Sequence, residues 1–394
     1  MKTSAFLYPW DVVGDPEAAA RVAGLGVQQV TLASAYHSTR ALTPRHPRHR
    51  VVTAEHAAVL YPPDEHRWQG RELRPYPAGR WAAAEDAYQV AADALAAAGL
   101  EVHTWVVLAH NSRLGAEHPH TSVVNAYGDQ YPWAPCIARP DVRRYLVDLA
   151  AEAAVRPGAA GTELESLGWY GLAHLHAHDK TAGVPLGDAA QYLMSLCFCG
   201  HCRDGYAEFG ADPGELAAAV RRALVPVWAG DATGPAGLPG IARLLGEELT
   251  VLSLDWRLHT ARLLQEQAVA AVRAAAPAGF QVLMHADPAA YRCGANAGVD
   301  PRHILGHTDG LVLPCTGGPQ AREAMLGPTA PHRGPHTVLA ANFTVVGGMG
   351  GSPGTLAADA AHAASLGANE LRLYHAGLAS DADLAAVRGA LRRN

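Results

Sequence analysis

The chain lacks the features that would direct it to a membrane or a nucleic acid. Its N-terminal segment MKTSAFLYPWDVVGDPEAAA has a short apolar run broken by Pro9 and Asp11, where a secretory signal needs about 7–15 apolar residues. No window approaches the roughly 18 uninterrupted apolar residues of a membrane span. The 31 Lys and Arg are scattered and outnumbered by 37 Asp and Glu, so no basic stripe can neutralise phosphates. We therefore expect a cytoplasmic protein without membrane or nucleic-acid partners.

Charge and cysteine are also scarce. Charged residues make up 17% of the chain and hydrophobic residues 49%, a balance that excludes disorder and supplies a large core. Three of only six cysteines crowd together as Cys197, Cys199 and Cys202, a spacing too tight for ordinary disulfide pairing but suited to a metal. We expect reduced thiols.

Short runs rich in Val, Leu and Thr alternate with Ala-rich helical patterns, which is typical of a parallel sheet covered by helices. Eight such runs are present, at 4–10, 28–34, 100–109, 160–166, 280–286, 309–315, 336–344 and 369–375. An open doubly wound sheet would more often have fewer strands and a Gly-rich phosphate loop after the first, which is missing here. The sequence therefore predicts an α/β fold, with residues 1–394 forming a single (β/α)8 TIM barrel.

Three long insertions follow predicted strands two, three and four, at 35–81, 110–139 and 167–278. Loops after the strands form the catalytic face of such a barrel, so this extra chain is expected to wall a substrate pocket. An alternative interpretation makes the insertions interfaces of a homo-oligomer. The largest, 167–278, carries the cysteine cluster.

The segment LCFCGHC places Cys197, Cys199 and Cys202 in a C-x-C-x2-C pattern, which lets three sulfurs converge on one ion. A closed tetrahedral site needs a fourth ligand, and both Cys136 and His201 are candidates. Without metal, the cluster would be three buried free thiols. Cys293 and Cys315 stand alone and are expected to be ordinary buried or pocket thiols.

This spacing, with a cysteine upstream, resembles the zinc site of the β-galactosidases of glycoside hydrolase family 42, which are also (β/α)8 barrels. The resemblance covers Cys136 to Cys202 and the architecture, and it implies the ligand set Cys136, Cys197, Cys199 and Cys202. It also implies a structural zinc, since four thiolates leave no open position for water. No organic cofactor is expected.

The fourth predicted strand ends in two carboxylates, Glu163 and Glu165, that point to the same side of the sheet. A carboxyl group near the barrel mouth, with its pKa raised by apolar neighbours, is the usual proton donor to a glycosidic oxygen. The barrel glycosidases that the chain resembles carry their acid/base Glu at this strand end. We expect Glu165 to be the acid, with Glu163 second. The structural alternative pairs a buried Glu163 with Arg40 or Arg113.

The seventh strand departs from those glycosidases, because HTVLAANFT (336–344) has no glutamate where their nucleophile stands. A second carboxylate would then be Asp287, Asp179 or Asp11, and Asp287 after strand five is placed best. The separation of the two carboxyl groups would distinguish an inverting from a retaining mechanism.

Histidines and aromatic residues also gather at the predicted strand ends, where they can bind sugar hydroxyls or stack on a pyranose ring. We expect about half of the aromatics to be core residues. The candidates for substrate binding are Trp10, His37, Arg40, His110, Trp169, Tyr170, His174, His178, His285, Asn342, Tyr374 and His375, and His176, Tyr36, Trp105 and Trp133 lie nearby.

Together these residues predict a glycoside hydrolase that acts on a small carbohydrate through Glu165 and a second carboxylate. One alternative is a metal-dependent sugar isomerase, epimerase or lyase, in which histidines and carboxylates hold an ion. Another is a sugar-binding barrel without catalysis, suggested by the empty position on strand seven.

Overall fold

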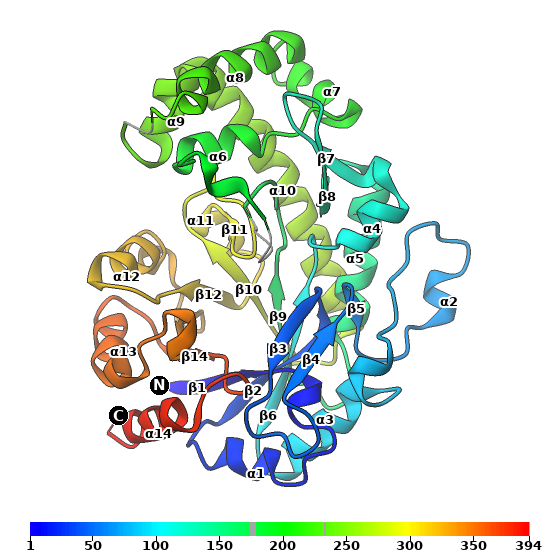
Figure 1. Cartoon of the computed structure of the whole chain (residues 1–394), viewed down its shortest axis with the longest axis vertical. Helices are drawn as coiled ribbons and strands as arrows, with labels where there is room; N and C mark the ends of the chain where they lie inside the picture. The colour runs from blue at the N-terminus through cyan, green and yellow to red at the C-terminus, as the bar shows by residue number, and fades with distance from the viewer. Residues whose placement is uncertain (174–178, 232–233, 394) are drawn as a thin grey trace.

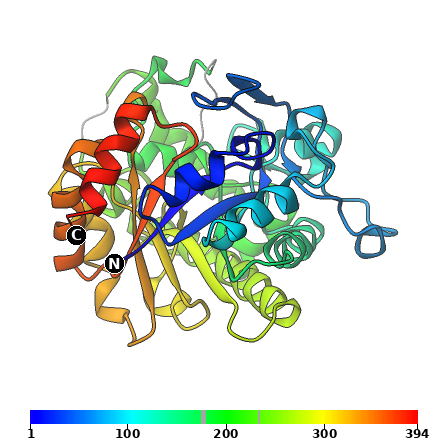
Figure 2. The same cartoon turned by 90° about the horizontal axis from the view of Figure 1, so that it is seen from below.

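The computed structural model of the chain, described for residues 1–173, 179–231 and 234–393, contains a closed barrel of eight parallel strands (Figure 1). The strands are β1 (Lys2–Leu7), β2 (Gln29–Tyr36), β6 (Glu101–Val107), β9 (Gly161–Glu165), β10 (Gln281–Asp287), β12 (Gly310–Pro314), β13 (Val338–Thr344) and β14 (Glu370–Tyr374). β1 pairs with both β2 and β14, which closes the sheet and brings the two termini close together (Figures 1 and 2). The predicted (β/α)8 barrel is confirmed.

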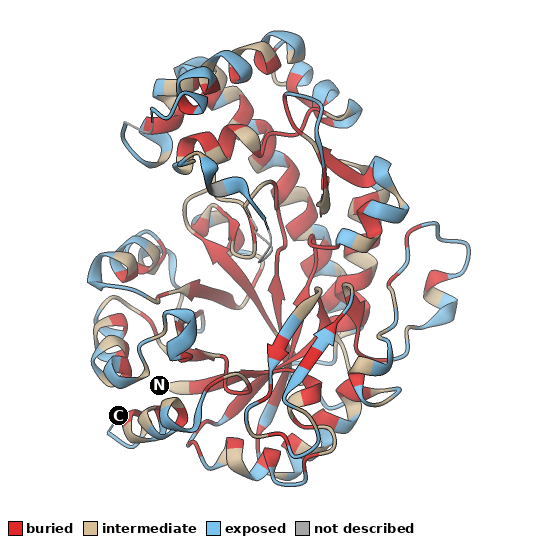
Figure 3. Ribbon diagram, in the orientation of Figure 1, coloured by how far each residue is buried: buried red, intermediate tan, exposed pale blue. Residues whose placement is uncertain are grey.

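Helices surround the barrel and turn their apolar sides toward it, as the buried stripes in Figure 3 show. They are α1 (Ala18–Ala23), α3 (Ala87–Ala97), α5 (Pro140–Ala154), α10 (Glu247–Ala275), α11 (Pro301–Ile304), α12 (Pro319–Leu326), α13 (Leu356–Ser365) and α14 (Asp381–Leu391). Gly99 follows α3 with φ +81° and Gly367 follows α13 with φ +104°. These conformations favour glycine and let the chain turn from each helix into the next strand.

The long segments after β2, β6 and β9 contain their own secondary structure. They hold the hairpin β3 (Thr39–Leu42) and β4 (Val51–Ala54), then β5 (Ala58–Val59), α2 (Glu65–Trp68), α4 (Ser112–Glu117), the hairpin β7 (Ser122–Val124) and β8 (Gln130–Pro135), α6 (Asp188–Met194), α7 (Gly200–Glu208), α8 (Pro213–Trp228) and α9 (Gly237–Leu245). Helices α6 to α9 gather beyond the barrel, at the top of Figure 1.

Short elements complete the description. They are β11 (Ala297–Gly298), which pairs with β10, and the 3-10 helices η1 (Pro9–Asp11), η2 (Arg80–Ala82), η3 (Pro119–Thr121), η4 (Thr181–Gly183), η5 (Ala330–His332), η6 (Gly347–Met349) and η7 (Pro353–Thr355). None of the helices in the described ranges is both long enough and apolar enough to cross a lipid bilayer.

Every second side chain of a barrel strand points inward, so the inward side chains fill the barrel interior in successive layers. Leu283, Val312, Val338 and Ala340 form a small apolar cluster inside it. Because side chains two residues apart on a strand share a face, Asn342 and Thr344 follow Val338 and Ala340 on the inner side of β13. The polar residues on the inner face near the strand ends are thereby directed toward the barrel mouth.

Candidate active site and cysteine cluster

A cavity of about 620 Å³ opens at the carboxyl ends of the strands, and every barrel strand or the residue directly after it contributes to its wall. The candidate residues that line it are Glu165, His37, Arg40, Tyr170, His285, Asn342 and Tyr374. Arg40 comes from the hairpin β3–β4, so the first insertion also forms part of the wall. Apolar, aromatic and polar groups are mixed in this wall, as in ordinary small-molecule sites.

Glu165 is the last residue of β9 and lies at the floor of this cavity. Its Oε2 accepts a hydrogen bond of 2.7 Å from the indole Nε1 of Trp105, and Nδ1 of His285 lies 3.9 Å from the same oxygen. Only 11% of the side chain is exposed. Burial raises the pKa of Glu165, and the nearby His285 and Trp105 offset this only in part. The carboxyl group is therefore held toward its protonated form.

Glu163 lies one level deeper and is fully buried. Its Oε1 accepts hydrogen bonds from Nε of Arg372 at 2.5 Å and from Oγ1 of Thr31 at 3.0 Å, and His285 Nε2 is 3.3 Å from Oε2. Burial alone would raise its pKa, but the Arg372 guanidinium and His285 outweigh it and hold the pKa at about 2. The buried ion pair expected for Glu163 exists, but its partner is Arg372 of β14 and not Arg40 or Arg113.

Asp287, proposed as the second carboxylate, is not among the described residues that line the cavity. Its Oδ1 accepts a hydrogen bond of 2.8 Å from the Ala289 amide, and Oδ2 lies 3.6 Å from Nε of Arg292. Burial raises the pKa of Asp287. Asp179 is exposed and also lies outside the described cavity wall.

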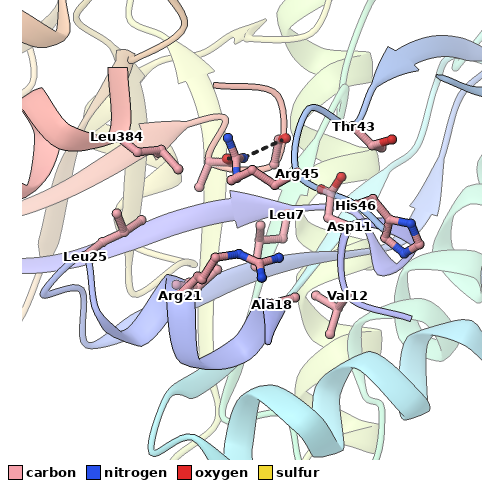
Figure 4. Close-up of a pocket in the computed structure, with 13 residues that line it drawn as sticks. Leu7, Asp11, Val12, Ala18, Arg21, Leu25, Thr43, Arg45, His46 and Leu384 are labelled. Atoms are coloured by element: carbon pink, nitrogen blue, oxygen red, sulfur yellow. Dashed lines mark hydrogen bonds between the residues drawn. The ribbon is translucent and has the colours of Figure 1, made fainter. Parts of the chain in front are cut away.

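Asp11 lies in a separate small pocket beside β1, together with Arg45 and His46 (Figure 4). Its Oδ2 accepts a hydrogen bond of 2.8 Å from the Tyr8 amide, and burial raises its pKa to about 7. A Cβ atom on Gly377 would come within 2.0 Å of this oxygen, so only glycine fits at that position. The three alternative carboxylates therefore lie outside the cavity wall as described.

Several candidate side chains lie behind the wall of the cavity. Trp10 and His375 are fully buried, and the ring of each stacks on that of Tyr8, with centroid separations of 4.5 and 4.2 Å. The His110 ring stacks on Tyr170 at 4.3 Å. Trp169 donates through Nε1 to the carbonyl oxygen of Arg257.

Burial lowers the pKa of His375 to about 3, so this imidazole is neutral. His174, His176 and His178 lie outside the described residues.

The sequence reasoning missed part of the wall. Tyr8, whose hydroxyl donates to that of Tyr36 at 3.0 Å, lines the cavity, although it was counted within the first strand. The other missed wall residues are Thr39, Ala41, Leu42, Ala295, Asn296, Pro314, Thr316, Thr344, Val346, Gly348, Met349 and Leu378. The inward alternation on β13 could have indicated Thr344 from Asn342, whereas residues from the loops carry no local signal.

The four predicted zinc ligands come together from two separate insertions. Cys136 directly follows β8, Cys197 and Cys199 precede α7, and Cys202 lies in its first turn. The four sulfur atoms all lie within 4.8 Å of one another, and Cys136 Sγ is 3.6 Å from those of both Cys199 and Cys202. His201, the competing fourth ligand, is exposed. The group can hold a metal ion.

The donor set and its surroundings fit a tetrahedral thiolate site. A tetrahedron with metal–sulfur bonds of about 2.3 Å has edges of about 3.8 Å, close to the observed separations. The backbone amides of Val124 and Cys199 lie 3.4 and 3.5 Å from Cys197 Sγ, where they donate to this sulfur. Such outer contacts stabilise a ligating thiolate.

Comparison with solved structures finds the same fold in several glycoside hydrolases. An α-L-fucosidase isoenzyme 2 from Paenibacillus thiaminolyticus is 12% identical, with a TM-score of 0.60 over 100% of this chain and 49% of its own. A GH42 β-galactosidase from G. stearothermophilus is 10% identical, with a TM-score of 0.57 over 99% and 56%. The PgaB (BpsB) glycoside hydrolase domain from Bordetella bronchiseptica is 15% identical, with a TM-score of 0.53 over 99% of both chains.

This chain thus spans about half the length of the fucosidase and of the β-galactosidase. No family model and no curated protein matches its sequence. At these identities the likeness shows the barrel fold alone. The matched structures include a member of the family that the cysteine spacing resembles.

Proposed function

We propose that the chain is a glycoside hydrolase, and that Glu165 donates the proton to the glycosidic oxygen. The observation that carries this proposal is a buried carboxyl group with a raised pKa on the floor of a cavity of about 620 Å³. A protonated carboxyl group near neutral pH is what general acid catalysis of glycoside cleavage requires. The fold shared with glycoside hydrolases supports the same proposal.

The walls of the cavity suit a sugar. Tyr8, Tyr36, Trp105 and Tyr374 supply flat apolar faces, the tyrosines add hydroxyl groups, and Asn296 and Arg40 offer further polar groups. A pyranose ring presents both C–H faces and hydroxyl groups, so it needs this mixture of stacking and hydrogen bonding. The substrate we propose is a small glycoside or oligosaccharide.

The positions of the side chains favour a hydrolase over a metal-dependent isomerase at this site. Glu163 and His285 would be the ligands nearest to Glu165, but Glu163 is already paired with the Arg372 cation. A bound metal ion would have to displace that guanidinium or share its carboxylate. The sets of possible metal ligands found among the described residues, including the cysteine cluster, contain no residue of the cavity wall.

A panel of chromogenic glycosides, assayed with the wild type and Glu165→Gln, tests the proposal. We expect at least one glycoside to be cleaved, and Glu165→Gln to lower kcat by about 10²–10⁴-fold, the usual contribution of a general acid. The matched control is Glu248→Gln, which removes an exposed carboxylate and should leave kcat unchanged. A wild type that binds sugars but cleaves none, with binding unaffected by Glu165→Gln, would instead support a non-catalytic sugar-binding barrel.

We also propose that Cys136, Cys197, Cys199 and Cys202 hold one structural zinc ion that joins the second and third insertions. Four thiolates leave no coordination position for water, so the ion would stabilise the fold and take no part in the reaction. Metal analysis should find about one zinc per chain in the wild type and in Cys315→Ser, a buried thiol outside the cluster. It should find none in Cys202→Ser, together with a lower melting temperature. Full zinc content in Cys202→Ser would contradict this assignment.

A further inference from the structure

Three side chains from two segments outside the barrel sheet come together away from both the cavity and the cysteine cluster. They are Glu266 of α10 and, from the segment that begins with α11, His303 and His307. Their donor atoms, one from each side chain, all lie within 4.8 Å of one another. Oε1 of Glu266 lies 3.0 Å from Nε2 of His303 and 4.0 Å from Nε2 of His307. None of these three described residues lines the cavity that contains Glu165.

The local sequence places the two histidines on one side of their segment. Asp300 caps α11 by accepting hydrogen bonds from the amides of Arg302 and His303, at 3.0 and 3.4 Å. The turn continues beyond the helix, because the His307 amide donates to the Ile304 carbonyl oxygen at 3.0 Å. His303 and His307, four residues apart, therefore face the same way, and their ring centroids are 4.8 Å apart. Two histidines at this spacing on a helical turn can present both imidazoles to one ion.

Two ion pairs hold α10 against the α11 segment on either side of this group. Nη2 of Arg262, one turn before Glu266 on α10, lies 2.6 Å from Oδ2 of Asp300. Nη2 of Arg273, near the end of α10, lies 3.1 Å from Oδ1 of Asp309. Each arginine is thus neutralised by its own aspartate. The contacts that fix the two segments do not use the three side chains, which are therefore brought together before any ion arrives.

The charge and the spacing of the donor atoms fit a divalent transition metal. Within the described residues, the side chains that pair with the Glu266 carboxylate are His303 and His307, and neither is a permanent cation. Zinc bonds of about 2.0–2.1 Å to nitrogen and oxygen put neighbouring ligand atoms about 3.3 Å apart, a value between the observed 3.0 and 4.0 Å. Imidazole and carboxylate are ligands that zinc binds together. A simple ion pair of Glu266 would need only one histidine.

We infer that Glu266, His303 and His307 bind a second zinc ion, separate from the one proposed for the cysteine cluster and independent of the proposed hydrolase. Three protein ligands leave one tetrahedral position for water, which four thiolates do not. The site is open to solvent, since 23% of the His303 side chain, 39% of His307 and 42% of Glu266 are exposed. Glu266 and His303 also line a surface groove of about 520 Å³. The ion therefore exchanges with solution and leaves on dialysis, and when bound it joins α10 to the α11 segment.

Titration of the dialysed full-length chain with zinc, followed by calorimetry, tests this site. We expect the wild type to bind one further equivalent of zinc beyond the ion that survives dialysis. His307→Gln should raise the Kd of this equivalent by about 100-fold, and Glu266→Gln, which keeps an oxygen, by about tenfold, because losing a ligand costs at least as much as losing its outer partner. His332→Gln, which replaces an exposed histidine outside the group, should bind like the wild type. No further equivalent in the wild type, or an unchanged Kd in both ligand variants, overturns the inference and leaves the hydrolase proposal intact.

Cobalt(II) distinguishes this ion from one bound to the cysteines. Added to the dialysed wild type, it should give visible d–d bands without the near-ultraviolet charge-transfer band that thiolate ligands produce. His307→Gln should lose the visible bands. Added zinc should also raise the melting temperature of the wild type but not of His307→Gln, because an ion that binds only the folded chain stabilises it. A thiolate band, or visible bands that persist in His307→Gln, contradicts the assignment.

Discussion

Glu163 and Glu165 lie only two positions apart on β9, yet their side chains have sharply different surroundings inside the barrel. Glu163 is fully buried and paired with Arg372, and its pKa is about 2. Glu165 opens to the cavity with a neutral Trp105 donor, and burial raises its pKa. The comparison shows that an arginine beside one buried carboxylate holds it in its charged form, whereas burial without such a partner shifts the other toward its protonated form.

The largest expected effect on stability comes from breaking the buried ion pair of Glu163 and Arg372. Glu163→Gln leaves the buried Arg372 without its main counter-charge, although Glu370 still accepts from Arg372 at 2.8 Å. Breaking a buried pair costs about 3–5 kcal/mol, and we expect about 3 kcal/mol because of that remaining contact. Urea unfolding at pH 7 measures the loss, with Glu248→Gln as the control.

The loss should also depend on pH. Because the folded-state pKa of Glu163 is lowered to about 2, its contribution is present above the unfolded value of 4.5 and disappears as the pH falls from there toward 2. Equal stability of Glu163→Gln and the wild type at pH 7 would mean that the pair does not hold the barrel together.

Asp11 extends the comparison to a buried carboxylate outside the cavity. Its pKa is raised from 3.8 to about 7, so its charged form weakens the fold and the wild type loses stability as the pH rises through this interval. Asp11→Asn should remove that loss. We expect a gain of about 2 kcal/mol at pH 8, half of the ceiling given by about 1.4 kcal/mol per pKa unit.

Thermal or urea unfolding between pH 4 and pH 8 measures the difference for Asp11→Asn. The exposed Asp204→Asn serves as a control, since it should unfold like the wild type at every pH. A constant difference between Asp11→Asn and the wild type across this range would contradict the raised pKa.

Replacing Glu165, at the cavity, should change the free energy of unfolding in the opposite direction to replacing Glu163. Because the pKa of Glu165 is raised by burial, its ionised form is destabilising, and Glu165→Gln should gain a smaller amount of unfolding free energy at pH 8 than Asp11→Asn. The gain should fade as the pH falls below the pKa of the wild-type side chain. A loss of stability in Glu165→Gln at pH 8 would show that this carboxylate, like Glu163, is structurally paired.

The smallest effect concerns Trp105, which donates a hydrogen bond to the Glu165 carboxylate. Trp105→Phe removes the 2.7 Å hydrogen bond, which stabilises the ionised form, so the pKa of Glu165 should rise further. The alkaline limb of the pH profile of kcat should then move to higher pH. Trp68→Phe, a buried indole that donates to Glu152 away from the cavity, controls for loss of packing and should leave the limb in place.

Local patterns were sufficient to predict the architecture. Eight β-rich runs that alternate with Ala-rich helical patterns predicted the barrel, because each such pattern is encoded within a few residues. The spacing of Cys197, Cys199 and Cys202 likewise marked a cluster, and the resemblance to a known zinc site added Cys136. The structure brings all four sulfurs together.

Such local patterns could not predict which residues pair with the buried charged groups. Arg372 lies 209 residues from Glu163, and no local feature of β14 marks it as the counter-ion. Asp287 stands at a strand end as expected, yet the loop that follows supplies Ala289 and Arg292 to hold it. Contacts of this kind depend on how the strands register around the barrel and on the course of the loops.

The sequence by itself therefore determined the strand-forming segments, the strand ends at which polar side chains gather and the cluster of Cys197, Cys199 and Cys202, because each depends on spacing along a single segment. Only the tertiary structure decided which of two neighbouring glutamates is neutralised by an arginine and which opens to the cavity. The physical reason is that a pKa depends on the charges and the solvent around a group in three dimensions, and barrel closure sets both.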